Sequence, residues 1–277
     1  MNAPRIVRGM SDADYHADPD TLSSTGARRC AVSPAAYKWA LDHPTPPTEA
    51  MLLGTAAHSI ILNTGAVAVV GNDLRTADAK AAKADAETAG TPWVRERDHE
   101  ALLTMREHVM THPDAGALLT GGESEVSVYT THPTGAALRT RPDRIRDRRT
   151  VVDLKTARDA NPQSWGRVMA DAGYHVQAAW YLRELVAADL VDEDAQFWFV
   201  VVASSPPHQV AVHRVGEEAL AVGEWEADRG IRQWVACRES GEWPDWADDY
   251  PQEAVLPTWA TRPYYTQLAD STEGDDW

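Results

Sequence analysis

Two charged residues interrupt an apolar stretch near the middle of the chain. In residues 150–157, with the sequence TVVDLKTA, the apolar residues are typical of a buried strand. Strand side chains alternate between two faces, so Asp153 and Lys155 share one face, and Val152 and Leu154 lie on the other. Burying an aspartate and a lysine costs free energy unless they pair or bind something. The stretch therefore predicts either a salt bridge or a functional site.

A second aspartate is predicted to lie beside the first. If an antiparallel hairpin turns near Arg148, Asp143 lies opposite Asp153, because the numbers of paired residues sum to a constant. Opposite Cβ atoms are about 5 Å apart, and two carboxylates that close repel each other unless a cation lies between them. Carboxylate oxygens favour Mg²⁺ or Mn²⁺. With Lys155 nearby to orient or deprotonate a water molecule, the pattern indicates metal-dependent hydrolysis of phosphodiesters. A surface hairpin with ordinary ion pairs is the alternative.

The charge distribution bears on a nucleic-acid partner. The net charge of −16 argues against one at first, but eight basic and three acidic residues lie between positions 139 and 158. By contrast, residues 241–277 contain nine acidic residues and one basic residue. A polyanion responds to local potential at short range, so Arg139, Arg141 and Arg144 are candidates for gripping a DNA backbone. Solvated arginines on a hairpin are the alternative.

Residue usage narrows the class of protein. The chain has 22 arginines but four lysines, so Lys155 within a strand indicates a need for a compact, movable ammonium group. The two cysteines, Cys30 and Cys237, exclude a disulfide framework and a four-cysteine zinc or iron–sulfur site. The N-terminus lacks an apolar signal segment, and no apolar run reaches the length of a membrane span. We therefore expect a soluble, cytoplasmic protein.

Hydrophobic periodicity predicts an α/β fold, in which helices flank a central mixed β-sheet. We expect one domain over residues 1–240, including a helical excursion at 76–112, and an irregular acidic strap or tail, rich in Trp and Pro, at 241–277. The predicted helices lie within residues 22–41 (two helices, the second opening at Ser33-Pro34), 49–65, 76–90, 96–112, 165–190 and 216–241. The predicted strands are a short one after residue 65, a three-stranded meander at 124–157 and a hairpin at 195–215.

The hairpin resembles the core of the PD-(D/E)xK nucleases. Pro142-Asp143 is followed, after nine intervening residues, by Asp153-Leu154-Lys155. The stretches GTAAHSIIL, GGESEVSVY and YHVQAAWYL resemble three motifs of the RecB-like branch, and within it those of the RecE-type exonucleases (exonuclease VIII). The resemblance to lambda exonuclease is more distant.

The resemblance implies roles for individual residues. The metal ligands would be His58, Glu125, Asp143 and Asp153, with Glu123 as the alternative to Glu125. Asp143, Asp153 and Glu125 would also belong to the catalytic set, together with Lys155. Gln177 and Tyr181 would lie on one helix face, where they could brace the lysine or a DNA phosphate. Since four cysteines are absent, the iron–sulfur members of the family are excluded.

The resemblance also implies an activity. It predicts a Mg²⁺-dependent exonuclease, with Mn²⁺ as a substitute, which degrades the 5′-ended strand from double-stranded DNA ends. The resulting 3′ overhang would serve a single-strand annealing protein in phage-type recombination. Family members form rings around DNA, so a homo-oligomer is implied. The alternatives are a RecB-like endonuclease, a single-strand nuclease, and a non-catalytic DNA-binding protein that assists recombination.

Overall fold

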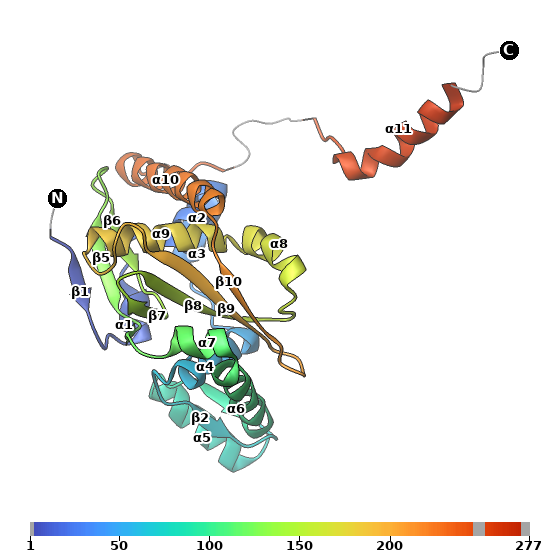
Figure 1. The fold of residues 1–277 in the computed structure, drawn as a ribbon. Helices are drawn as coiled ribbons and strands as arrows, with labels where there is room; N and C mark the ends of the chain where they lie inside the picture. The colour runs from blue at the N-terminus through green and yellow to red at the C-terminus, as the bar shows by residue number, and fades with distance from the viewer. Residues whose placement is uncertain (1–2, 246–252, 273–277) are drawn as a thin grey trace. The chain divides into compact units, whose positions relative to one another are not determined.

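The computed structural model describes residues 3–245 and 253–272, and its chain forms two compact units. The larger unit spans Met1–Trp243, and the smaller one spans Pro244–Trp277. A five-stranded mixed sheet in the order β10-β9-β8-β7-β4 lies at the centre of the larger unit (Figure 1). Its strands are β4 (Glu123–Ser124), β7 (Arg144–Asp147), β8 (Thr150–Ala157), β9 (Gln196–Ala203) and β10 (Val210–Arg214). Strands β8 and β9 are parallel and the other pairs are antiparallel, which confirms the predicted α/β fold.

Helices cover both faces of this sheet, and two smaller sheets flank it (Figure 1). One small sheet has the order β1-β5-β6, and the other pairs β2 with β3 in parallel. Their strands are β1 (Arg5–Val7), β5 (Ser127–Thr131), β6 (Ala137–Thr140), β2 (Ala68–Val70) and β3 (Trp93–Arg95). The helices of the larger unit are α1 (Asp12–Ala17), α2 (Ser24–Val32), α3 (Pro34–Asp42), α4 (Glu49–Leu62), α5 (Ala77–Thr88), α6 (Glu96–Thr111), α7 (Pro113–Leu119), α8 (Pro162–Ala172), α9 (Tyr174–Ala187) and α10 (Glu217–Ser240).

The side chains of β8 enter two different cores, as their alternation predicts. Val152 and Leu154 pack with residues of α4, α6 and α7 on one face of the sheet. Val151 packs on the other face with Phe197 and Phe199 and with residues of α8 and α9. Because Asp153 and Lys155 have the parity of Val151, they lie on the face that α9 covers.

The predicted three-stranded meander is wrong, since the chain changes sheets twice within it. At Glu125 it passes from β4 in the central sheet to β5 in a flanking sheet, and at Pro142-Asp143 it returns from β6 to β7. Glu125 makes its crossing with a φ of 51°, in the left-handed region that few residues other than glycine adopt. The two crossings adjoin, because the backbone N–H of Glu125 donates to the carbonyl of Asp143 (3.4 Å).

The predicted helix at 165–190 is two helices. Gly173 ends α8 in a left-handed conformation with φ of 70°, and its backbone N–H donates to Ala170 and Met169. α9 then begins anew at Tyr174. The periodicity of the two helices is similar enough for the sequence to read as one, but the glycine marks the break. The paired helices predicted within 22–41 are confirmed as α2 and α3, whose N-caps are Ser23 and Ser33.

One helix end and one further helix also differ from expectation. α4 ends at Leu62, with Asn63 in the left-handed conformation, instead of continuing to Gly65. The C-terminal segment, predicted to be irregular, contains helix α11 (Thr258–Thr272), although it has Pro263 within it.

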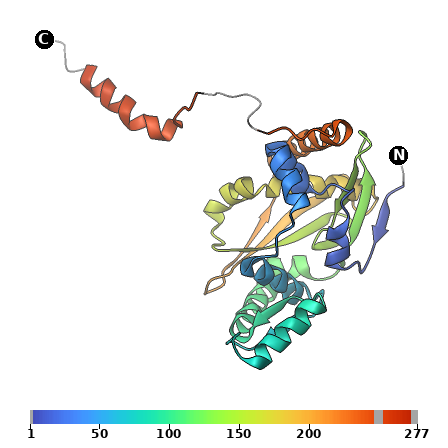
Figure 2. The same cartoon turned by 180° about the vertical axis from the view of Figure 1, so that it is seen from behind.

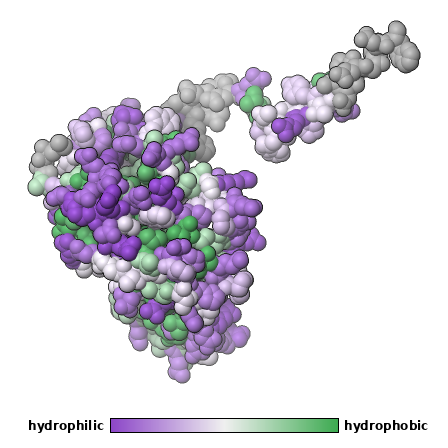
Figure 3. Space-filling view, in the orientation of Figure 1, coloured by the Kyte–Doolittle hydropathy of each residue, from purple (hydrophilic) through white to green (hydrophobic). Residues whose placement is uncertain are grey.

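Hydrophilic side chains cover most of the face shown in Figure 3, with smaller hydrophobic areas between them. No described helix is both long and apolar enough to cross a membrane. Cys30 and Cys237 are buried and free.

Close packing of α2 against α10, which lie side by side in Figure 2, generates a stability prediction. A Cβ on Gly230 of α10 would lie 2.3 Å from the backbone oxygen of Ala27 in α2. Gly230→Ala should therefore destabilise the fold by about 1–3 kcal/mol, because neither backbone can yield cheaply. Gly166→Ala in α8 is the matched control, since nothing lies within 4 Å of its added Cβ. It should be neutral or stabilising by up to about 1 kcal/mol. Urea unfolding measures both, and equal effects would contradict the packing described.

Candidate active site

Lys155 and Asp153 form an ion pair that a helix residue bridges. Lys155 Nζ lies 2.6 Å from Asp153 Oδ2, and Asp153 is only 2% exposed. Gln177 on α9 contacts both groups, donating from Nε2 to Asp153 Oδ1 (2.8 Å) and accepting from Lys155 Nζ at Oε1 (2.9 Å). The lysine also lies 4.5 Å from the ring centroid of Tyr174. The structure thus brings three sequence-predicted residues together.

Burial and charge act on these groups in opposite directions. Burial and the neighbouring Asp143 raise the pKa of Asp153 to about 6, although Lys155 acts to lower it. Burial alone would lower the pKa of Lys155, but Asp153 and Asp143 outweigh it, so the net shift is upward. The lysine therefore remains an ammonium group, while the aspartate lacks enough nearby positive charge to ionise as easily as in water.

Asp143 lies just before β7, at the point where the chain re-enters the central sheet. The pairs Arg144–Val152 and Ile145–Val151 have the predicted register. Continued by one residue, this register would set Asp143 opposite Asp153, although Asp143 itself lies outside β7. Asp143 Oδ2 accepts a hydrogen bond from the backbone N–H of Leu154 (2.7 Å). Burial raises the pKa of Asp143, but the charge of His58 outweighs it, and the net shift is downward.

His58 reaches this region from α4. Its Nε2 lies 2.7 Å from the carbonyl oxygen of Leu154 and 3.3 Å from Asp143 Oδ2, and its Nδ1 lies 2.9 Å from the carbonyl oxygen of Gly54. A carbonyl oxygen only accepts hydrogen bonds, so these two contacts fit an imidazolium, in which both ring nitrogens donate. Burial would lower the pKa of His58, but Asp143 more than offsets it and the pKa is about 9. To ligate a metal, His58 would first have to lose a proton.

The glycine one turn before His58, Gly54, is not a point of close backbone packing. A Cβ on Gly54 would meet Thr156 Oγ1 at 3.8 Å, an ordinary contact, so no other backbone approaches it closely. What Gly54 supplies is the carbonyl oxygen for His58.

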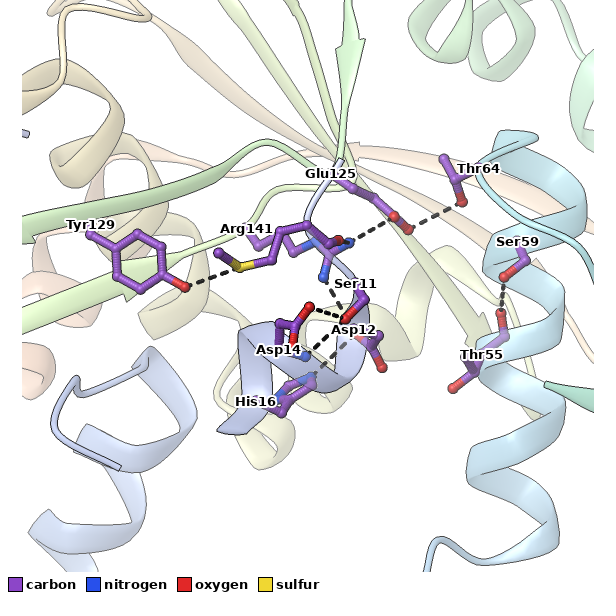
Figure 4. A network of polar contacts seen from close by, with 11 residues as sticks. Ser11, Asp12, Asp14, His16, Thr55, Ser59, Thr64, Glu125, Tyr129 and Arg141 are labelled. Atoms are coloured by element: carbon purple, nitrogen blue, oxygen red, sulfur yellow. Dashed lines mark hydrogen bonds and ion pairs between the residues drawn. The ribbon is translucent and has the colours of Figure 1, made fainter. Parts of the chain in front are cut away.

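Glu125 lies at the edge of this cluster and is held from two sides (Figure 4). Its Oε1 accepts a hydrogen bond from Thr64, just after α4, and its Oε2 accepts one from Arg141 Nη2 (3.1 and 3.0 Å). Glu123, the alternative, is on edge strand β4, where Arg8 binds both of its carboxylate oxygens. Glu125 is therefore the glutamate that connects with α4 and with the strand end before Asp143.

The candidate DNA-binding arginines bind groups of the chain itself. Arg139 Nη1 donates to the backbone oxygen of Asp18 and to Thr21 Oγ1. Arg144 Nη1 donates to the carbonyl oxygen of Gly121 (3.1 Å), and burial lowers the pKa of its guanidinium. Arg141 binds Glu125. Contact with DNA remains a prediction for all three.

Tyr181, the other residue of the Gln177 motif, is partly buried and packs near Phe197, with ring centroids 6.1 Å apart. Burial raises the pKa of its phenol well above the usual value. Sequence reasoning missed Thr64 and Tyr174, which contact Glu125 and Lys155. Tyr174 is three residues before Gln177, a spacing that places both on one helix face and could have indicated it.

The oxygen donors suit a hard divalent cation, but they do not converge. Across the described parts of the chain, no group of three or more His, Cys, Asp or Glu side chains is arranged to hold a metal ion. Asp153 Oδ2 is buried and makes no hydrogen bond to any described residue, despite its ion pair with Lys155. An unsatisfied buried carboxylate oxygen beside a second carboxylate favours a cation. The donor set thus fits such an ion in its chemistry, and Glu125 would have to turn to join it.

Comparison with known proteins assigns the family. Residues 23–250 match a family model described as "PDDEXK-like domain of unknown function (DUF3799)". The chain belongs to this family. No curated protein matches. The PDDEXK-like description of the family agrees with the resemblance to the PD-(D/E)xK core that Asp143, Asp153 and Lys155 indicated in the sequence.

The fold is also similar to that of a solved structure from Eubacterium rectale, described as a "Putative exonuclease". The TM-score is 0.64 at 13% sequence identity, with 93% of this chain and 98% of the other covered. At this identity the likeness concerns the fold.

The environment of His58 generates a pH prediction. In metal-free protein, NMR should find His58 protonated at pH 7, with a titration midpoint near 9. Because the folded pKa is raised, the stabilisation that the bound proton gives is complete below about pH 6.5 and is lost as pH rises through about 9. Asp143→Asn should lower the midpoint. Asp147→Asn, an exposed carboxylate of the same hairpin, should leave it unchanged. A wild-type midpoint near 6.5 would disprove the imidazolium assignment.

Proposed function

We propose that this protein is a Mg²⁺-dependent deoxyribonuclease that degrades duplex DNA from its ends. The observation that carries the proposal is the Lys155–Asp153–Gln177 cluster, with Asp143 in register beside it, in a PDDEXK-like chain. Gln177 holds the lysine in place, and two neighbouring carboxylates keep it protonated. Such an ammonium group can orient the water molecule that attacks a phosphodiester.

The side chains divide the chemistry between them. Asp143 and Asp153, with Glu125 after it turns and His58 after it loses a proton, would hold the cation. Mg²⁺, or Mn²⁺ in its place, would supply polarisation of the phosphate and a lower pKa for a bound water.

Lys155 would orient that water and offset the negative charge that develops on the phosphoryl oxygens. Gln177 keeps the ammonium in place through its amide oxygen while its amide nitrogen holds Asp153, so both groups keep one orientation.

We infer the polarity and the product of cleavage from the resemblance of the sequence motifs to those of RecE-type exonucleases. We propose stepwise removal of the 5′-ended strand, leaving a 3′ overhang for a single-strand annealing partner in recombination. A homo-oligomeric ring would place the basic hairpin toward DNA and the acidic surface outward, which reconciles the net charge of −16 with a DNA substrate. Light scattering on DNA tests the ring, and a monomer would refute it.

Replacement of the lysine tests the assignment of the site. Lys155→Met should lower Mg²⁺-dependent cleavage of linear duplex DNA by at least about 100-fold, since the water loses its positioning group. Lys38→Met is the matched control, because Lys38 pairs with Asp42 on the exposed side of α3 and should retain full activity. Circular dichroism and urea unfolding check that both variants fold. Unchanged cleavage by folded Lys155→Met would remove Lys155 from the mechanism.

The form of the DNA tests the mode of cleavage. Linear duplex labelled separately at each 5′ and 3′ terminus should lose its 5′ labels first, with Mg²⁺ present, and a covalently closed circle should remain intact. Cutting of the circle would favour the RecB-like endonuclease, and release of label from single strands alone would favour a single-strand nuclease. If no DNA is cut although the protein binds it, the chain is a DNA-binding accessory protein.

A further inference from the structure

Glu125 is held in a position that it must leave to reach the aspartates. Both carboxylate oxygens are occupied, one by Thr64 and one by Arg141. Its backbone is in the left-handed region, which costs of the order of 1 kcal/mol and is found preferentially at functional sites. The side chain is 32% exposed, so it has room to turn.

Arg141, in contrast, is fixed by contacts that do not involve Glu125. Its Nη2 also donates to the backbone oxygen of Met10 (3.0 Å), and its guanidinium carbon lies 5.4 Å from the ring centroid of Tyr15, a buried residue of α1. Asp12, 3.5 Å from Nη1, adds an ion pair (Figure 4). The guanidinium would therefore stay in place if Glu125 left.

The guanidinium also has donors to spare. The Arg141 side chain is 11% exposed, and its Nε and Nη1 are buried and make no hydrogen bond among the residues that the structure describes, although Nη1 has its ion pair with Asp12 at 3.5 Å. Buried donors without acceptors are costly, and a guanidinium fork matches the oxygens of a phosphate. These donors would fit an anion bound beside Arg141. Such an anion would be close in sequence to the candidate metal ligand Asp143, two residues after Arg141.

We propose that Arg141 is a positioning residue that exchanges Glu125 for a phosphate of DNA when Glu125 turns to a divalent cation. Cation and DNA then bind cooperatively. The proposal rests on the function proposed above and names the residue that connects its cofactor to its substrate.

The physical basis is charge balance at a largely buried guanidinium. When Glu125 turns away, Arg141 loses the nearer of its two carboxylate partners, and Asp12, 3.5 Å from Nη1, then compensates its largely buried charge only in part, which is unfavourable. A phosphate restores the balance and meets the spare donors. Since the coupling is thermodynamic, DNA must strengthen cation binding by the same factor by which the cation strengthens DNA binding.

Binding measurements test the coupling without turnover. All variants carry Lys155→Met, and a fluorescently labelled DNA duplex is titrated by anisotropy with and without Mg²⁺ at constant ionic strength, because salt alone changes DNA affinity. Calorimetry measures Mg²⁺ affinity with and without the duplex. In the Lys155→Met protein each ligand should strengthen the other about 5- to 150-fold, by equal factors. Adding Arg141→Gln should reduce this factor to about one, weaken DNA binding, and leave Mg²⁺ affinity in DNA-free protein unchanged or higher.

Arg139→Gln is the matched control. Arg139 is two residues earlier on β6 and contacts the same Tyr15 ring (5.3 Å), but it binds Asp18 and Thr21 instead of Glu125. Because Arg139 is itself a candidate DNA contact, its replacement should at most weaken DNA binding by the same factor with and without Mg²⁺, and it should retain the coupling. If Arg141→Gln fails to fold, Glu125→Gln replaces it and should also abolish the coupling.

The outcomes separate the two proposals. If the coupling persists in folded Arg141→Gln or Glu125→Gln, the exchange is wrong and the nuclease assignment stands. If the Lys155→Met protein shows no coupling although wild type cuts DNA with Mg²⁺, the exchange is again wrong. If wild type neither takes up Mg²⁺ nor cuts DNA, the proposed function fails and the exchange fails with it.

Discussion

The buried ion pair of Asp153 and Lys155 is the interaction on which the rest of the site depends. Removing two charges from water is costly, and mutual attraction offsets the cost only when further hydrogen bonds satisfy both groups. Gln177 provides one such bond to each group, because an amide can donate to Asp153 Oδ1 and accept from the Lys155 ammonium at once. Asp153 Oδ2 makes no hydrogen bond to any described residue and has only its ion pair with Lys155. The two bonds of Gln177 require α9 to lie over one face of β8 at a fixed rotation. The helix break at Gly173 lets α9 take that orientation independently of α8.

The second constraint is the pair of sheet changes. Glu125 and Asp143 belong to neither regular strand run, since each lies where the chain passes between two sheets. A residue beyond a strand end is not hydrogen-bonded to a neighbouring strand in the regular pattern. Its side chain and backbone can therefore contact a site instead of packing into a core. The hydrogen bond from Glu125 N–H to the Asp143 carbonyl fastens the two crossings together. The cluster is thus built at a junction, with α4 contributing His58 from a third direction.

Local pattern was enough to predict part of this arrangement. Strand alternation placed Asp153 and Lys155 on one face, and hairpin arithmetic placed Asp143 opposite Asp153. Both depend on nearest-neighbour geometry, which a sequence contains. The sheet changes depend on which distant strand each segment pairs with, for example β5 with the N-terminal β1, and the sequence showed only continuous strand propensity. The partners of the arginines were hidden for the same reason, because Met10 and Asp18 come from far along the chain. The roles of all the predicted site residues, in metal binding, catalysis and DNA binding, still stand as predictions.

The hairpin of β7 and β8 has a consequence for how such domains are compared. Asp143 immediately precedes β7 and Asp153 lies within β8, so the number of residues between them depends on how far the hairpin extends beyond these positions and does not measure the separation of the carboxylates. Adding one residue to each strand beyond the pair would widen the interval by two and leave both acids where they are. Searches that require a set interval between the two acids would therefore overlook relatives whose hairpins merely extend farther from the sheet junction.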